Sequence, residues 1–140
     1  MNIKPPEIIL GFDPGRDKCG LAVRDQKDQI LYHEVVSSEA AIATLKSVSQ
    51  QYPIDLLVMG NQTTSKQWKK QLESELSPTF PIVMVDERNS SLEARDRYWQ
   101  MYPPQGLTRL IPQGMRLPPC PIDDIVAILL IERYLNNTED

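Results

Sequence analysis

The sequence predicts an α/β fold with a five-stranded mixed sheet that is flanked by helices. Three apolar runs joined by short polar turns come first, and this pattern is typical of an antiparallel meander. After residue 36 the apolar residues recur every three or four positions, and helical stretches then alternate with short buried strands. Alternating strands and helices are joined by right-handed crossovers, which make part of the sheet parallel. The expected order of elements is β-β-β-α-β-α-β-α-α.

Residues 8–23 are the stretch around which the other elements are arranged. Two apolar runs flank a tight turn here, and Asp13 ends the first run, which is apolar on both faces as in a central strand. Pro14 and Gly15 fit the two central positions of a type II turn, since proline presets φ and glycine accepts a positive φ. Asp13 is therefore expected on a rigid strand at the rim of the sheet. Aspartate also commonly opens turns, and this stretch alone leaves both roles open.

The remaining elements follow from apolar spacing and from the residues that begin and end helices. Ser37 or Ser38 can cap the first helix, and residues 90–93 match a capping box at the start of the third. Residues 1–6 read as a loose end. The expected strands are 7–13, 19–25, 29–36, 54–60 and 81–85, and the expected helices are 38–51, 66–76, 90–100 and 122–135.

Size and composition indicate one domain, residues 1–140, in a reducing compartment. The chain has 140 residues with 41% hydrophobic and 24% charged residues, which is ordinary for a globular protein with one substantial core. No apolar run approaches the roughly 18–20 residues of a membrane helix, and no signal-peptide pattern is present. Two scattered cysteines form neither a disulfide framework nor a CxxC pair. We therefore expect a cytoplasmic protein that does not contact a membrane.

Charge and metal-binding residues narrow the function classes. The formal net charge is −4, which counts mildly against a nucleic-acid binder because such proteins usually carry a basic face. A local basic patch is still compatible with this total. One histidine, His33, and two separated cysteines argue against a structural zinc site.

Acidic residues stand at the ends of three predicted elements. Asp13 ends the first strand, Asp86 and Glu87 follow the fifth, and Asp123 and Asp124 open the last helix. Carboxylates without a nearby histidine or cysteine suit Mg²⁺ or Mn²⁺, and two such ions about 4 Å apart can hold the reacting oxygens of a phosphodiester. Each acid alone also fits a helix cap or a solvated strand end. Only the occurrence of acids at the ends of all three elements favours a metal site.

Four segments of the chain resemble the YqgF family of the RNase H-like superfamily, which is related to the RuvC resolvases. They are LGFDPGRDKCGLAV, DLLVMG, PIVMVDERNSSLEARDRYW and IDDIVAILLIERYL, in this order between residues 8 and 135. The segment 86–94 is the most specific of them. The resemblance implies an RNase H-like fold and a metal-dependent nuclease. Such an enzyme hydrolyses phosphodiester bonds of structured nucleic acid, as a Holliday-junction resolvase or in pre-16S rRNA processing.

The resemblance also assigns roles to residues that match the family's motifs. Asp13, Glu87 and Asp123 are expected to be catalytic and to bind Mg²⁺ or Mn²⁺, with Asp124 as a further metal ligand. The implied partner is branched DNA or precursor rRNA, bound by a monomer or a homodimer. Basic residues that could contact phosphates, each of which could equally be a surface charge, are Arg16, Lys18, Lys66, Lys70, Arg88, Arg109 and Arg116.

Two segments depart from the family's pattern. Residues 61–64 stand where the family usually has a loop with proline and asparagine. The segment 102–121 contains six of the twelve prolines, shows no apolar period and is longer and less basic than the resemblance implies. Long irregular loops are often functional or mobile. We expect this segment to be the least regular part of the chain and to form a flap near the acids that closes over substrate.

Two other functions are compatible with part of the sequence. An ATP-binding protein of the sugar-kinase and actin class also uses a D-x-G-x-x-x-x-G segment, but that class needs two such domains and far more than 140 residues. A catalytically silent nucleic-acid-binding or regulatory module with the same fold fits the acidic balance of the chain. Metal-dependent cleavage of nucleic acid would distinguish the nuclease from this module.

Overall fold

The computed structural model describes residues 8–61, 64–76 and 78–138. The strands are β1 (Ile8–Asp13), β2 (Lys18–Asp25), β3 (Ile30–Ser37), β4 (Leu56–Gly60) and β5 (Ile82–Val85). The helices are α1 (Ala41–Gln51), α2 (Ser65–Leu76), α3 (Ser90–Met101) and α4 (Asp123–Thr138), with 3-10 turns η1 (Ser38–Ala40), η2 (Gly106–Leu110) and η3 (Gln113–Met115). The predicted order of strands and helices is confirmed. The expected loose end at 1–6 and two residues of the loop at 61–64 lie outside the described residues.

The five strands form one mixed sheet in the order β3-β2-β1-β4-β5. β1 is central, as its apolar faces predict, and it pairs antiparallel with β2 and parallel with β4. β4 in turn pairs parallel with β5. Because β1, β4 and β5 run in the same direction, the residues that follow them gather at one edge of the sheet. This edge therefore receives Asp13, Gly60 and Glu87.

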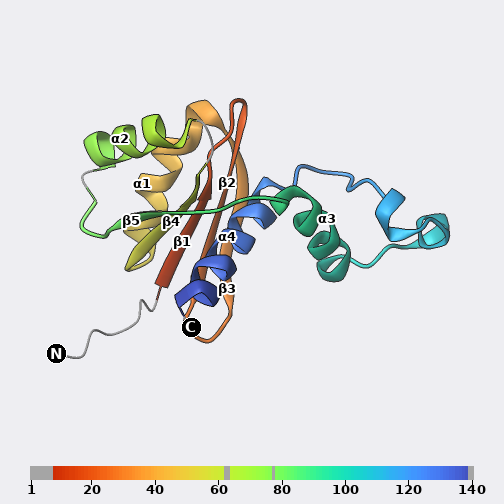
Figure 1. Cartoon of the computed structure of the whole chain (residues 1–140). Coiled ribbons are helices and arrows are strands. Elements are labelled where there is room, and N and C mark those ends of the chain that lie inside the picture. Colours follow the sequence, from red (N-terminus) through yellow and green to blue (C-terminus); the bar gives the residue numbers. More distant parts are fainter. Residues whose placement is uncertain (1–7, 62–63, 77, 139–140) are drawn as a thin grey trace.

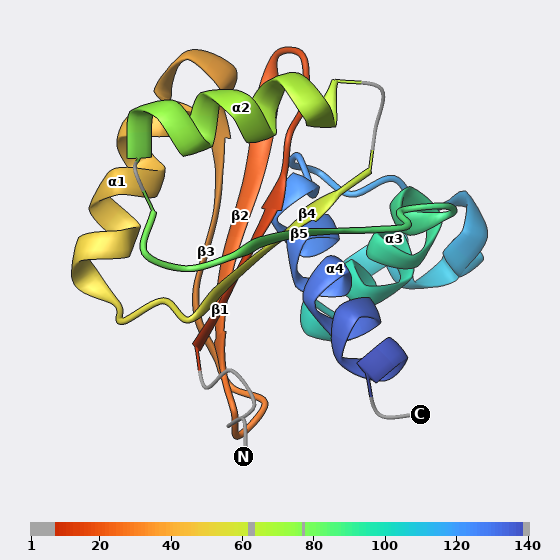
Figure 2. The ribbon, with the colours of Figure 1, turned by 60° about the vertical axis from the view of Figure 1, so that its left-hand side comes forward.

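Helices cover both faces of the sheet. Figures 1 and 2 show α1 and α2 on one face and α4 on the other, with α3 beside α4. The side chains of each strand alternate between two cores. Leu10 and Phe12 of β1 belong to the core under α1 and α2, while Ile9 belongs to the core under α4. In the described part of the chain, no helix has both the length and the apolar character needed to cross a membrane.

The turn between β1 and β2 differs from the predicted type II turn. Gly106 is the glycine with a positive φ among the described residues, so Gly15 lacks the backbone angle that this turn requires. A Cβ at Gly15 would instead collide with the carbonyl oxygen of Lys18. The Ser38 hydroxyl donates to the Gly15 carbonyl at 2.8 Å, and the Ser38 N–H donates to the Asp17 carbonyl at 2.9 Å. Contacts with η1 therefore shape this loop.

The predicted cap before the first helix is present, but the predicted cap of the third helix is not. The Ser37 hydroxyl accepts the N–H of Ala40 at 3.2 Å and caps η1, which leads into α1. The capping box at 90–93 is wrong, because Asn89 precedes α3 with a φ of 62° and no side-chain cap. The Ser90 N–H donates to the Glu87 carbonyl at 3.0 Å instead. This backbone bond does the work that a capping side chain would do.

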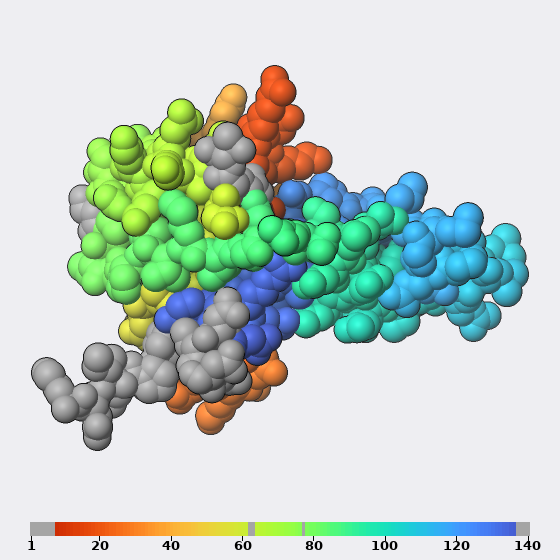
Figure 3. Space-filling view, in the orientation of Figure 1, coloured from red at the N-terminus to blue at the C-terminus, as the bar shows by residue number. Residues whose placement is uncertain are grey.

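The segment 102–121, called the arm from here on, is only partly as predicted. It contains neither strand nor α-helix, but it does form η2 and η3. Its middle part, residues 106–115, projects from α3 away from the sheet, so the expected flap over the acids is wrong for this part (Figures 1 and 3). Arg116 donates to the Ile111 carbonyl at 2.7 Å and lies over the Trp99 ring at 5.8 Å. The first contact lies within the arm, and the second connects the arm to α3.

Candidate active site

Asp13 is a buried acid at the end of the central strand, with 6% of its surface exposed. Burial, together with the negative charges of Glu87 and Asp123, raises its pKa to about 8. A carboxylate out of water loses its hydration, and like charges nearby disfavour its ionised form again. The three acids that the family motif indicates therefore share one electrostatic environment.

Glu87 follows β5 and reaches toward the neighbouring strand. A Cβ at Gly60, the last residue of β4, would collide with the Glu87 carboxylate, so the absence of a side chain there makes room for it. Burial raises the pKa of Glu87, the positive charge of Arg133 lowers it, and the nearby Asp86 raises it. Asp86 itself is exposed, and its carboxylate accepts the N–H of Arg88 at 3.0 Å. Of these two neighbouring acids, Asp86 holds the turn and Glu87 lies at the sheet edge.

Asp123 is brought to the same edge by the close approach of α4 to β2. Gly20 pairs with Asp13 in the register of β1 and β2. A Cβ at Gly20 would collide with the backbone carbonyl of Asp123, so only glycine lets the start of α4 lie directly on the strand. Burial raises the pKa of the Asp123 side chain, while a backbone N–H and the charge of Lys18 lower it. The half-buried Asp123 thus joins Asp13 through a packing contact between backbones.

His33 also belongs to this region, although the sequence indicated no histidine near the acids. It lies on β3, and its Nδ1 is 2.6 Å from Oδ2 of Asp124. The other carboxylate oxygen of Asp124 accepts the N–H of Ile125 at 2.9 Å. The two partners are 91 positions apart, and no local spacing could have predicted their contact. Both oxygens of Asp124 are thus engaged by the protein.

Several of the basic residues that were predicted to contact phosphates lie at the sheet edge that carries the acids. Lys18 begins β2 and acts on Asp123, and Arg16 is exposed in the loop between β1 and β2. Arg88 is exposed directly after Glu87. Each of these positions could meet a phosphate beside the acids.

The other basic candidates lie along α2 and in the arm. Lys66 is exposed at the start of α2, where the Ser65 hydroxyl donates to the Gly60 carbonyl, and Lys70 is exposed one turn further on. Arg109 and Arg116 belong to the arm. Arg116 also donates to the Arg109 carbonyl at 3.3 Å, so its guanidinium is used within the arm itself.

The donor set suits a divalent cation, but the carboxylates do not yet form a coordination shell. Among the residues that the structure describes, no three His, Cys, Asp or Glu side chains are arranged to hold a metal ion. The available donors are carboxylate oxygens, which hard cations prefer. Besides burial, the negative charges of Glu87 and Asp123 raise the pKa of Asp13, and a cation would compensate these charges. A metal ion would therefore have to draw the three side chains closer together.

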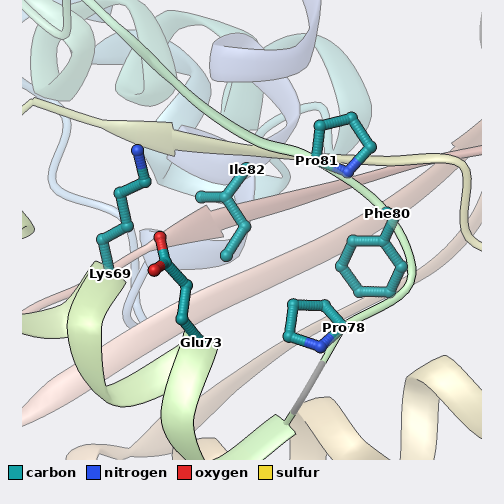
Figure 4. Close-up of a pocket in the computed structure, with 6 residues that line it drawn as sticks. All are labelled: Lys69, Glu73, Pro78, Phe80, Pro81 and Ile82. Carbon is teal, nitrogen blue, oxygen red and sulfur yellow. The ribbon is translucent and has the colours of Figure 1, made fainter.

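A surface cavity of about 530 Å³ lies apart from the acids. It is formed by α2 and the segment that leads into β5 (Figure 4). None of Asp13, Glu87 and Asp123 lines it. Its lining residues are Lys69, Glu73, Pro78, Phe80, Pro81 and Ile82.

Comparisons with known proteins agree with this fold. The family model for RuvX, described as Holliday junction resolvase, matches residues 7–137. The chain is 27% identical over 150 residues to the "Putative pre-16S rRNA nuclease" of Legionella pneumophila (strain Lens), covering 96% of this chain and 99% of that protein. It is 29% identical over 100 residues to Protein tex of Bordetella pertussis, and this match covers 62% of this chain but only 12% of Protein tex.

A solved structure shows the same fold. Thermus thermophilus RuvC in complex with Holliday junction substrate matches with a TM-score of 0.63 and 17% sequence identity, and the match covers 95% of each chain. The expected RNase H-like fold is thereby confirmed.

Proposed function

This chain belongs to the RuvX family of Holliday junction resolvases, and we propose that Asp13, Glu87 and Asp123 form its active site. Enzymes of this family are nucleases that act on phosphodiester bonds. The observation that carries this proposal is the state of Asp13. It is a carboxylate at the end of the central strand, and its burial and the charges of two further acids together raise its pKa to about 8. A strongly perturbed acid beside other acids is typical of functional sites.

The proposed site depends on divalent metal ions, as RuvC-like resolvases do in general. Mg²⁺ or Mn²⁺, when bound, would activate water and stabilise the leaving oxygen of the phosphodiester. The rigid end of β1 orients Asp13, and Glu87 and Asp123 approach it from β5 and α4. We assign Asp124 to orienting the start of α4 rather than to the metal, because its two oxygens contact His33 and the N–H of Ile125.

The proposed substrate is structured nucleic acid, either branched DNA or precursor rRNA. Lys18, Arg16 and Arg88 would bind phosphates beside the acids, and Lys66 and Lys70 would extend this contact along α2. A junction resolvase cuts two strands and would act as a homodimer, whereas a monomer suffices to process RNA. A cytoplasmic location agrees with Cys19 and Cys120, which are both free thiols.

One cleavage experiment tests this function. The protein is incubated with a four-way DNA junction and with pre-16S rRNA, in Mg²⁺, in Mn²⁺ and in EDTA. We expect cleavage of at least one substrate that requires metal, is abolished in Asp123→Asn and persists in the matched variant Asp124→Asn. Binding of both substrates without any metal-dependent cleavage would favour the silent module. Equal activity of the two variants would contradict the assignment of Asp123.

A further inference from the structure

Arg133 of α4 contacts the loop that carries Glu87. One terminal nitrogen, Nη1, donates to the Asp86 carbonyl at 2.8 Å, and the other, Nη2, donates to the Arg88 carbonyl at 2.6 Å. These carbonyls belong to the residues directly before and after Glu87. Nη2 also lies 3.1 Å from the Glu93 carboxylate, which orients the guanidinium from the α3 side.

The loop depends on these hydrogen bonds because little of it is buried. Asp86, Arg88 and Asn89 are all exposed. The Glu87 carbonyl accepts the N–H of Ser90 at 3.0 Å, so the carbonyls of three successive residues all have donors. Two of these three donors come from Arg133. The path of the backbone at Glu87 is thus set by this side chain more than by apolar packing.

We propose that Arg133 is a positioning residue that fixes Glu87 for metal-dependent cleavage, an inference that rests on the proposed function. A guanidinium presents two donors in a rigid plane, whereas a lysine ammonium has no such fork and could hold only one of the two carbonyls well. The helix that carries Arg133 also begins with Asp123. α4 therefore locates two of the three acids, one through its first residue and one through this side chain.

The competing explanation is that Arg133 only stabilises the packing of α4 against α3. The chain contains a matched control for this explanation. Arg97 of α3 makes two hydrogen bonds to Glu132 of α4, at 2.9 and 2.6 Å. This pair joins the same two helices as Arg133 and Glu93 do. Within the described residues, no hydrogen bond or ion pair joins Arg97 to the Glu87 loop.

The first measurement is steady-state cleavage of the better substrate by the wild type, Arg133→Ala, Arg133→Lys, Arg97→Ala and Glu93→Gln. We expect kcat to fall roughly 10- to 100-fold in Arg133→Ala, as for other residues that orient a metal ligand, with KM for the nucleic acid little changed. Arg133→Lys recovers part of the loss. Arg97→Ala keeps a kcat near that of the wild type. Glu93→Gln, which removes the charge beside Arg133 but leaves Arg133 in place, lowers kcat less than Arg133→Ala does.

The second measurement is amide hydrogen exchange, which does not require activity. In Arg133→Ala the N–H groups of Arg88 and Ser90 should exchange faster, because their acceptors lie in the released loop, while Arg97→Ala leaves them unchanged. If the wild type cleaves neither substrate but this exchange pattern appears, the proposed function is wrong, while the role of Arg133 in fixing the Glu87 loop is supported.

Three results would overturn the positioning role. They are unchanged exchange in Arg133→Ala, a wild-type kcat in that variant, and an equal loss of kcat in Arg97→Ala. If Arg133→Ala does not fold, Arg133→Lys decides the question. Wild-type kcat and exchange in Arg133→Lys would then contradict the need for two donors.

Discussion

Replacing Asp13 by asparagine removes a charge that the folded protein disfavours while keeping the shape of the side chain. Burial, together with the charges of Glu87 and Asp123, raises the pKa of Asp13 from its ordinary 3.8 to about 8. The folded protein therefore retains a proton that the unfolded chain releases above about pH 4. It follows that, without metal, the free energy of unfolding of the wild type decreases as the pH rises from about 4 to about 8.

The magnitude of this effect follows from the pKa of Asp13. One pKa unit corresponds to about 1.4 kcal/mol, so a rise from 3.8 to about 8 corresponds to at most about 6 kcal/mol over the whole window. With 6% of its surface exposed, Asp13 has little water to screen its charge. Local relaxation reduces such penalties, and we expect Asp13→Asn to be more stable than the wild type by about 3 kcal/mol at pH 8.

The assay is urea unfolding in EDTA at pH 5 and pH 8. The matched control is Asp17→Asn, which removes one charge from an exposed position in the same loop. We expect the advantage of Asp13→Asn to be small at pH 5 and large at pH 8, and the control to show none. Mg²⁺ should restore stability to the wild type at pH 8 by mass action, but not to Asp13→Asn. A wild type equally stable at both pH values in EDTA, or a less stable Asp13→Asn at pH 8, would refute this reasoning.

Three further predictions concern packing around the acids. Gly20→Ala should lower the free energy of unfolding by roughly 1–3 kcal/mol or more in urea, because its Cβ meets the backbone carbonyl of Asp123 and α4 must shift; unchanged stability would contradict this contact. Gly60→Ala meets only the flexible carboxylate of Glu87, so its stability should change little while metal-dependent cleavage collapses; a fully active variant would contradict the assigned role of Glu87. Phe12→Ala empties a fully buried position and should cost about 3–5 kcal/mol in the same unfolding assay.

Local signals predicted the elements well but the details at their ends poorly. The apolar runs, the change of spacing after residue 36 and the two apolar faces of β1 were sufficient for the sheet. The type II turn at Gly15 and the capping box at Ser90 were wrong. At the first, the Ser38 hydroxyl donates to the Gly15 carbonyl. At the second, the Ser90 N–H donates to the Glu87 carbonyl, and Arg133 donates to the carbonyls on either side of Glu87. Sequence patterns describe a segment's own preferences and contain no information about such donors.

By itself, the sequence determined the order of strands and helices and placed acids at the ends of three elements, because both depend on neighbouring residues. Its resemblance to a family also singled out Glu87 and Asp123. Only the tertiary structure decided how these acids meet, since this depends on α4 lying directly on β2 at Gly20. The same packing brings His33 to Asp124 and Arg133 to the loop of Glu87, across 91 and more than 40 positions of sequence. Contacts over such separations arise only when the sheet and α4 come together, and no local pattern encodes them.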